Sequence, residues 1–134
     1  MLLGILIPLI IGYLYNVFTS DSYWLLKDFH SLILLIIIYP LIEEITFRGW
    51  MQEYILKTSI GKEKFFNISI ANIFTTILFT LMHLIHHSYF WAFLVIFPSL
   101  IFGYFKEQFN SVIPPIILHS FYNFMFFSII YISE

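Results

Sequence analysis

Three charged residues interrupt one of the most apolar runs of the chain. The stretch LIEEITFRGW, residues 41–50, follows directly after SLILLIIIYP and contains Glu43, Glu44 and Arg48. An ionisable group inside a bilayer costs about 2.5–3.5 kcal/mol on insertion scales, so it marks a candidate functional site. Glu44 and Arg48 are spaced to share one face of a helix in the favoured Glu-to-Arg order. Glu43 lies about 100° further round, so we expect Glu44 to pair with Arg48 and Glu43 to be available.

The same three charges have a second interpretation, in which they form a polar network where a helix ends near lipid headgroups. Gly49 follows them directly, and they lie late in the apolar segment. Both interpretations are open on this stretch alone. Pro40, just before the glutamates, removes an amide donor and tends to kink a helix, which would turn backbone carbonyls toward a cavity.

Histidines occur in a second apolar stretch, LFTLMHLIHHSYF, residues 78–90. His83 lies within the apolar run and would need a polar partner there. His86 and His87 border a short turn, and we interpret them as interfacial groups.

A third stretch, PPIILHSFYNFMFF, residues 114–127, carries His119 and Asn123. Their spacing places them on one face of a helix, where both can donate hydrogen bonds. Alone, the pair is typical of a structural contact between membrane helices. With Glu43 and His83, it forms a set that can converge in a bundle: a general base, a deep histidine and two donors for a developing oxyanion.

The composition indicates that these residues lie in membrane helices. Apolar residues make up 60% of the 134 residues and charged residues 10%, against about 45–50% and 25% in soluble domains. The net charge of −2 and the lack of a basic cluster argue against a nucleic-acid partner. The absence of cysteine excludes disulfides, cysteine nucleophiles and thiolate metal sites. We expect a single integral-membrane domain over residues 1–134.

Five segments approach the roughly 20 apolar residues that a helix needs to cross a bilayer. They span about 2–18, 31–50, 68–86, 89–105 and 112–132. They predict an all-α, multi-pass membrane helical bundle with about five transmembrane segments. Strands are not expected, because the runs are continuously apolar. The first run lacks a basic start and a cleavage site, so we interpret it as a retained segment rather than a signal peptide.

The lysines predict the orientation of these segments. With five crossings, one side would hold the N-terminus and Lys57, Lys62, Lys64 and Lys106, against Lys27 on the other. The positive-inside rule then places the N-terminus in the cytoplasm, and we expect the cell membrane as the location. The interval 51–67 mixes apolar and charged residues, which suits a helix lying in the interface, with Gly61 ending or bending it.

Three short patterns resemble the motifs of one known family. EEITFR (43–48) resembles its EExxxR motif, FTLMH (79–83) its FxxxH motif and HSFYN (119–123) its HxxxN motif, in that order. These are the motifs of the CPBP family of intramembrane glutamic endopeptidases. The family includes CAAX prenyl endopeptidases and bacteriocin-processing or self-immunity (Abi-like) proteins. The resemblance covers about residues 31–127, most of the chain.

The resemblance implies an enzyme that hydrolyses a peptide bond of a membrane-associated peptide or protein. Glu43, with His83 near it, would activate a water that attacks the scissile amide carbonyl. His119 and Asn123 would stabilise the tetrahedral oxyanion. The resemblance implies no acyl-enzyme, no metal and no cofactor.

It also implies that Glu44 and Arg48 are a supporting pair, which agrees with their helical spacing. The expected partners are the lipid bilayer and a membrane-embedded peptide or protein substrate. Because family members often carry additional N-terminal helices, a partner membrane protein is a candidate source of elements that gate the substrate.

Two other functions fit parts of the sequence. HLIHH (83–87) matches a histidine box of membrane di-iron enzymes, and a metal site of His83, His87 and Glu43 is an alternative, although five histidines are few for such enzymes. A non-catalytic immunity or adaptor protein would share every motif and use the polar residues for packing. Glu43→Ala and His83→Ala separate the peptidase from the immunity or adaptor protein, because only the peptidase has a cleavage activity to lose. Metal analysis of the purified protein, with His87→Ala as the variant, tests the metal site.

Overall fold

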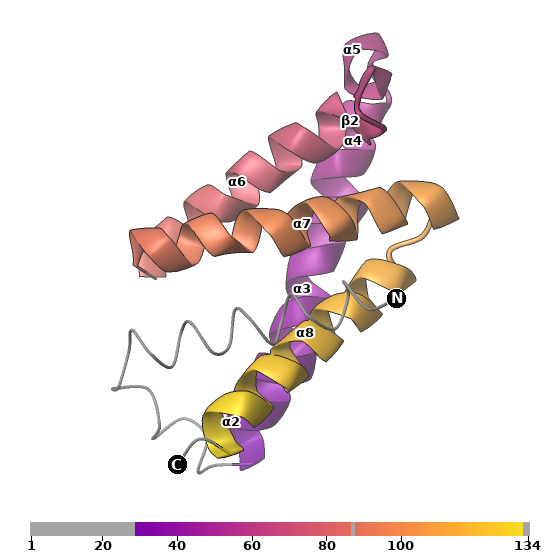
Figure 1. Cartoon of the computed structure of the whole chain (residues 1–134). Coiled ribbons are helices and arrows are strands. Elements are labelled where there is room, and N and C mark those ends of the chain that lie inside the picture. Colours follow the sequence, from indigo (N-terminus) through magenta and orange to yellow (C-terminus); the bar gives the residue numbers. More distant parts are fainter. Residues whose placement is uncertain (1–28, 87, 133–134) are drawn as a thin grey trace. The chain divides into compact units, whose positions relative to one another are not determined.

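The structure, a computed structural model, describes residues 29–86 and 88–132 (Figure 1). The expected segment at 2–18, with its interpretation as a retained membrane segment, lies outside these residues, as do Lys27 and His87. The chain divides into two compact units, which are described separately here. Of the described residues, the first includes 29–41 and 118–132, and the second 42–86 and 88–117.

One helical stretch runs from Phe29 to Leu56. It alternates between α- and π-helical geometry, as α2 (Phe29–Ile33), η2 (Leu34–Ile38), α3 (Tyr39–Glu44), η3 (Ile45–Gln52) and α4 (Glu53–Leu56). The later helices are α6 (Ile70–His86), α7 (Tyr89–Phe109) and α8 (Ile113–Ile132). The expected helical character of the four later apolar segments is therefore confirmed.

Two helices in the described part of the chain are long and apolar enough to cross a membrane. They are Phe29–Leu56 and α7, while α6 contributes a shorter apolar helix, Ile70–Ile85. The crossing count of about five stays a prediction.

A π-helical turn, η2, lies directly before Pro40. The kink expected there stays a prediction. The Tyr39 N–H donates to the carbonyl of Leu34, five residues earlier, instead of four as in an α-helix. Pro40 has no N–H, and its ring would clash with the carbonyl four residues before it in regular α geometry. The wider π turn therefore accommodates a proline inside a continuous helix.

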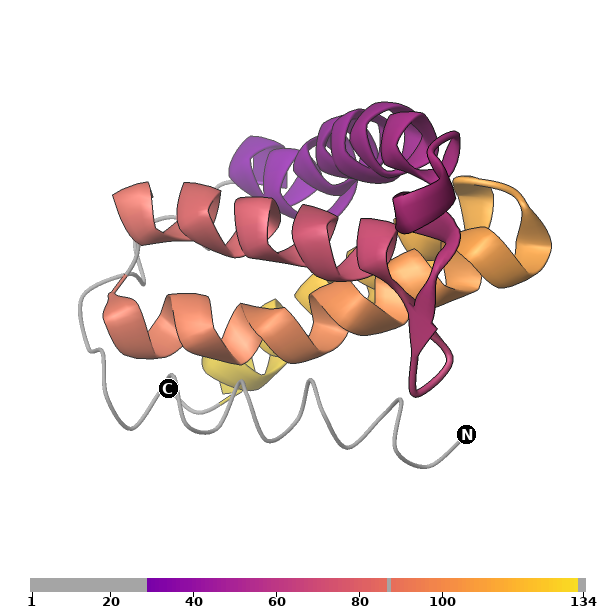
Figure 2. The ribbon, with the colours of Figure 1, turned by 90° about the horizontal axis from the view of Figure 1, so that it is seen from above.

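In the second unit, α6 and α7 lie side by side (Figure 2). A glycine allows them to approach closely: a Cβ atom at position 103 would lie 2.0 Å from Oδ1 of Asn72. The Asn72 side chain also donates from Nδ2 to the Leu100 carbonyl at 2.9 Å. Asn72 therefore joins the two helices at the point where Gly103 leaves room for it.

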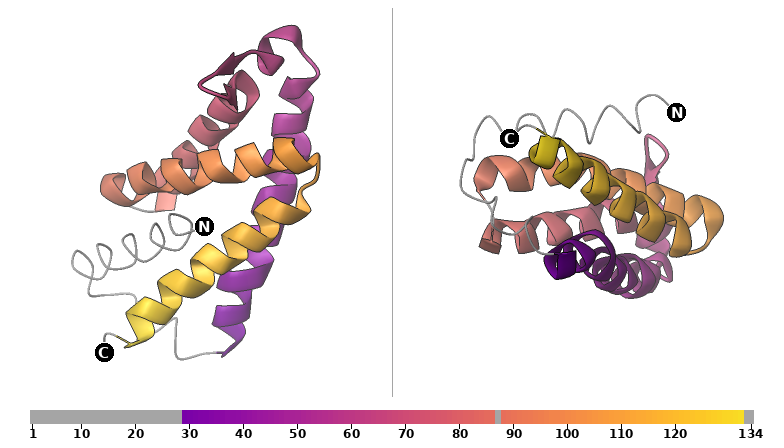
Figure 3. Two further views of the ribbon diagram at one scale, coloured as in Figure 1. Left: turned by 45° about the vertical axis from the view of Figure 1, so that its right-hand side comes forward. Right: turned by 90° about the horizontal axis from the view of Figure 1, so that it is seen from below.

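The interval 51–67 differs from the interfacial helix expected there. The helix ends at Leu56, and a short helix α5 (Ser59–Lys62) and a hairpin of β1 (Lys64–Phe65) and β2 (Ile68–Ser69) follow (Figure 3). The hairpin also corrects the expectation that strands are absent. Phe66 and Asn67 have φ values of 47° and 66°, and two consecutive left-handed residues make the tight turn that joins antiparallel strands.

Candidate active site

The expected ion pair of Glu44 and Arg48 is present in the second unit. Arg48 Nη1 donates to Glu44 Oε1 at 3.2 Å, and both residues are 0% exposed. The helix continues past them to Leu56. The helix end that the second interpretation places at this pair is therefore wrong, and both side chains are enclosed by protein. The position of the pair relative to lipid headgroups stays a prediction.

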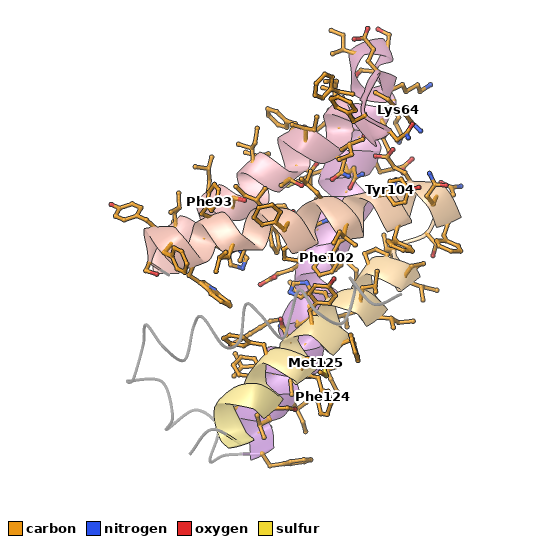
Figure 4. The ribbon with its side chains drawn as sticks, in the orientation of Figure 1. Lys64, Phe93, Phe102, Tyr104, Phe124 and Met125 are labelled. Carbon is orange, nitrogen blue, oxygen red and sulfur yellow. The ribbon has the colours of Figure 1, made fainter. Side chains whose placement is uncertain are left out.

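Arg48 is held by α7 as well as by its own helix. Its Nη2 donates to Ser99 Oγ at 2.7 Å and to the Ser99 carbonyl at 3.1 Å. The guanidinium carbon lies 4.5 Å from the ring centre of Phe79 on α6 and 5.7 Å from that of Phe102, which Figure 4 shows on α7. The flat cation therefore has hydrogen-bond partners in its plane and aromatic rings nearby.

A chain of hydrogen bonds extends from Arg48 through the second unit. Ser99 Oγ accepts from Arg48 and donates to Thr76 Oγ1 at 3.0 Å, and Thr76 Oγ1 donates to Asn72 Oδ1 at 3.3 Å. Asn72 completes it by donating to the Leu100 carbonyl. Each hydroxyl accepts one bond and donates one, so the chain has a single direction and its bonds polarise one another. We call Arg48, Ser99, Thr76 and Asn72 the arginine chain.

Sequence reasoning did not single out Ser99, Thr76 or Asn72. One signal was present: Asn72, Thr76, Phe79 and His83 recur at the i, i+4, i+7 and i+11 positions of one helix face. Of this face, Phe79 packs against the Arg48 guanidinium, and Thr76 and Asn72 are connected to Arg48 through Ser99. His83 lies on the same face, near the C-terminal end of α6.

The C-terminal end of η3 is also bound to α7. Gln52 Nε2 donates to the Gly103 carbonyl at 3.1 Å and to Glu107 Oε1 at 2.7 Å. Ser69 donates to the same Glu107 oxygen. Lys106 pairs with Glu53. These contacts fix how η3 and α4 run against α6 and α7.

Glu43 and His83 lie away from Gln52 and Ser69, beyond the packing contact of Phe47 with Phe79. The Phe47 and Phe79 rings pack edge to face with centres 5.0 Å apart. Gln52, at the end of η3, is linked through Glu107 to Ser69, just before α6, so η3 and α6 run antiparallel where they pack together. Glu43 lies one turn before Phe47 and His83 one turn after Phe79. Because the two helices are antiparallel, both residues lie on the same side of the contact between Phe47 and Phe79.

The ring orientation of His83 is fixed by its own helix. Its Nδ1 lies 2.9 Å from the Phe79 carbonyl, and the two rings are 4.5 Å apart between centres. A carbonyl only accepts, so Nδ1 carries the hydrogen in this bond, and in the neutral ring Nε2 is then the acceptor. A half-buried histidine in this tautomer can receive a proton at Nε2.

His119 and Asn123 belong to α8 in the first unit. His119 is 7% exposed, and Asn123 is half-buried. Asn123 Nδ2 donates to the Leu35 carbonyl of η2 at 2.8 Å. For Asn123, this bond is the kind of structural helix contact that the sequence allowed for His119 and Asn123. It uses one of the two amide hydrogens of Asn123.

The alternative metal site of His83, His87 and Glu43 includes His87, which lies outside the described residues. Within residues 29–86 and 88–132, no three His, Cys, Asp or Glu residues are grouped so that they could hold a metal ion.

Comparison with known families identifies the chain. The profile of the type II CAAX prenyl endopeptidase Rce1-like family matches residues 24–125, which include all three motifs. Comparisons with curated proteins and with solved structures gave no match. The match covers most of the chain, and the apolar helices agree with a membrane peptidase. The chain belongs to the Rce1-like family of type II CAAX prenyl endopeptidases.

Proposed function

We propose that this chain is a metal-independent glutamic endopeptidase of the cell membrane, spanning it several times, with Glu43 as the general base. The observation that carries the proposal is the different placement of the two neighbouring glutamates. Glu44 is fully buried and bound to Arg48, whereas Glu43 is half-buried and lies toward His83. A carboxylate bound to a buried guanidinium is poorly suited to take a proton, so the base is Glu43.

In the proposed reaction, Glu43 removes a proton from water as its oxygen attacks the scissile amide carbonyl. His83 holds this water through Nε2, because Nδ1 is engaged by the Phe79 carbonyl. His119 and Asn123 donate hydrogen bonds to the oxyanion that forms on the substrate. The proton then passes from Glu43 to the leaving amine as the C–N bond breaks, and the carboxylate is restored.

The proposed substrate is a peptide or protein held in the bilayer. The family name points to a prenylated CAAX tail as the first substrate to test. A membrane-embedded peptide without a prenyl group is the second.

The test uses the full chain in bilayer nanodiscs with a farnesylated CAAX peptide. Glu43→Gln preserves the shape of the side chain and removes the base, and we expect turnover to fall by at least about 100-fold. His83→Ala should also abolish cleavage. Glu63→Gln is the matched control, since Glu63 is exposed in the loop before the hairpin and should leave turnover unchanged.

Three outcomes would overturn the proposal. Full activity in Glu43→Gln would exclude Glu43 as the base. Stoichiometric iron or zinc in the purified protein, lost together with activity in His87→Ala, would favour the metalloenzyme. A chain that inserts normally but cleaves neither the prenylated nor the unprenylated peptide would indicate the immunity or adaptor function.

A further inference from the structure

The Leu35 carbonyl in the first unit has lost its helical donor. In an α-helix it would accept from the N–H of Tyr39, but that N–H donates to Leu34 instead. In π geometry it would accept from residue 40, which is a proline and has no N–H. Neither helical pattern therefore supplies a backbone donor to this carbonyl.

Asn123 supplies the missing donor. Its Nδ2 lies 2.8 Å from the Leu35 oxygen, a normal hydrogen-bond length. A side-chain amide is planar and carries two hydrogens on its nitrogen. When one hydrogen is held by a backbone carbonyl, the direction of the second is fixed as well.

We propose that Pro40 is a positioning residue for the reaction. By withholding a backbone N–H, it releases the Leu35 carbonyl, which anchors one amide hydrogen of Asn123 and orients the other toward the substrate. The proposal rests on the proposed function only for the use of that second hydrogen. The anchoring itself concerns stability and can be tested separately.

The first test is a double-mutant cycle on unfolding in mixed micelles. Asn123→Ala should raise the unfolding equilibrium constant about three- to tenfold, as expected for a hydrogen bond between membrane helices. In a Pro40→Ala background, residue 40 regains an N–H, and the Leu35 carbonyl regains a backbone donor. In that background, Asn123→Ala should have almost no effect on the unfolding equilibrium constant. If Asn123→Ala does not accumulate, Asn123→Ser replaces it in the same cycle, because its hydroxyl is too short to reach.

Pro114→Ala is the matched control. Pro114 lies in the first turn of α8, where the N–H of a residue has no helical acceptor and a proline releases no carbonyl. This substitution should leave the effect of Asn123→Ala unchanged. An equal effect of Asn123→Ala in the wild-type and Pro40→Ala backgrounds would overturn the anchoring.

The second test measures cleavage. Pro40→Ala should leave the protein at least as stable as wild type, yet lower kcat about tenfold with KM unchanged, because the second hydrogen of Asn123 loses its orientation. If Pro40 had only a structural role, Pro40→Ala would not lower kcat while stability and KM stay unchanged. An unchanged kcat would overturn the positioning role. If Glu43→Gln retains activity, the proposed function fails, while the stability cycle still decides whether Pro40 creates the anchor.

Discussion

Two adjacent threonines on α6 provide a test of the arginine chain. Thr75 and Thr76 are 1% and 3% exposed, and their side chains have the same size and type. The Thr76 hydroxyl accepts from Ser99 and donates to Asn72. The Thr75 hydroxyl has no hydrogen-bond partner among the described residues. Replacing each with valine exchanges the hydroxyl for a methyl group of similar size.

The expected effects on stability have opposite signs. Thr76→Val leaves the Ser99 hydroxyl and the Asn72 oxygen without their partner inside the unit. One of the two lost bonds joins α6 to α7 and the other lies within α6. At roughly 0.6–1.7 kcal/mol each, the range for side-chain hydrogen bonds between membrane helices, their loss should lower the free energy of unfolding by about 1–3 kcal/mol. Thr75→Val removes a buried hydroxyl that gains nothing in the fold, so it should be neutral or stabilise by up to about 1 kcal/mol.

The assay is denaturant unfolding of the full chain in mixed micelles, with cleavage of the farnesylated peptide as a second readout. Because Ser99 also accepts from Arg48, Thr76→Val should loosen the pair with Glu44 and lower kcat about three- to tenfold, whereas Thr75→Val should not change it. Equal destabilisation by the two substitutions would refute the arginine chain as a source of stability. An unchanged kcat in Thr76→Val would refute its link to the site.

Four further substitutions test individual positions. Arg48→Lys keeps the charge but cannot bridge the Glu44 side chain and α7 with a planar fork, so we expect a loss of about 3–5 kcal/mol of stability in the same unfolding assay. Gly103→Ala should strongly destabilise, since its Cβ would overlap the Asn72 side chain at 2.0 Å, whereas Gly49→Ala, with its nearest neighbour at 3.4 Å, should cost less than about 1 kcal/mol. Asn67→Gly should raise the melting temperature slightly, because glycine adopts a φ of 66° without strain.

The helical segments could be predicted because hydrophobic runs of this length have few other folded forms in a membrane. The pair of Glu44 and Arg48 could be predicted because both residues lie on one helix, where a spacing of four sets their separation. The chemistry of proline predicted a kink at Pro40, whereas the structure has a π-helical turn directly before it. The turn at Phe66 and Asn67 could not be predicted, because neither residue requires a positive φ and the sequence carries no glycine there.

The sequence by itself determined the family, the helical class and the unequal surroundings of Glu43 and Glu44, since all of these depend on motifs or on neighbours along one helix. Only the tertiary structure decided that Arg48 donates to Ser99 on α7 and that Asn123 donates to the Leu35 carbonyl. Serine, threonine and asparagine are common in apolar helices, and their partners depend on which helix faces meet. That choice depends on packing between segments far apart in the chain, such as the close approach at Gly103, and local spacing does not encode it.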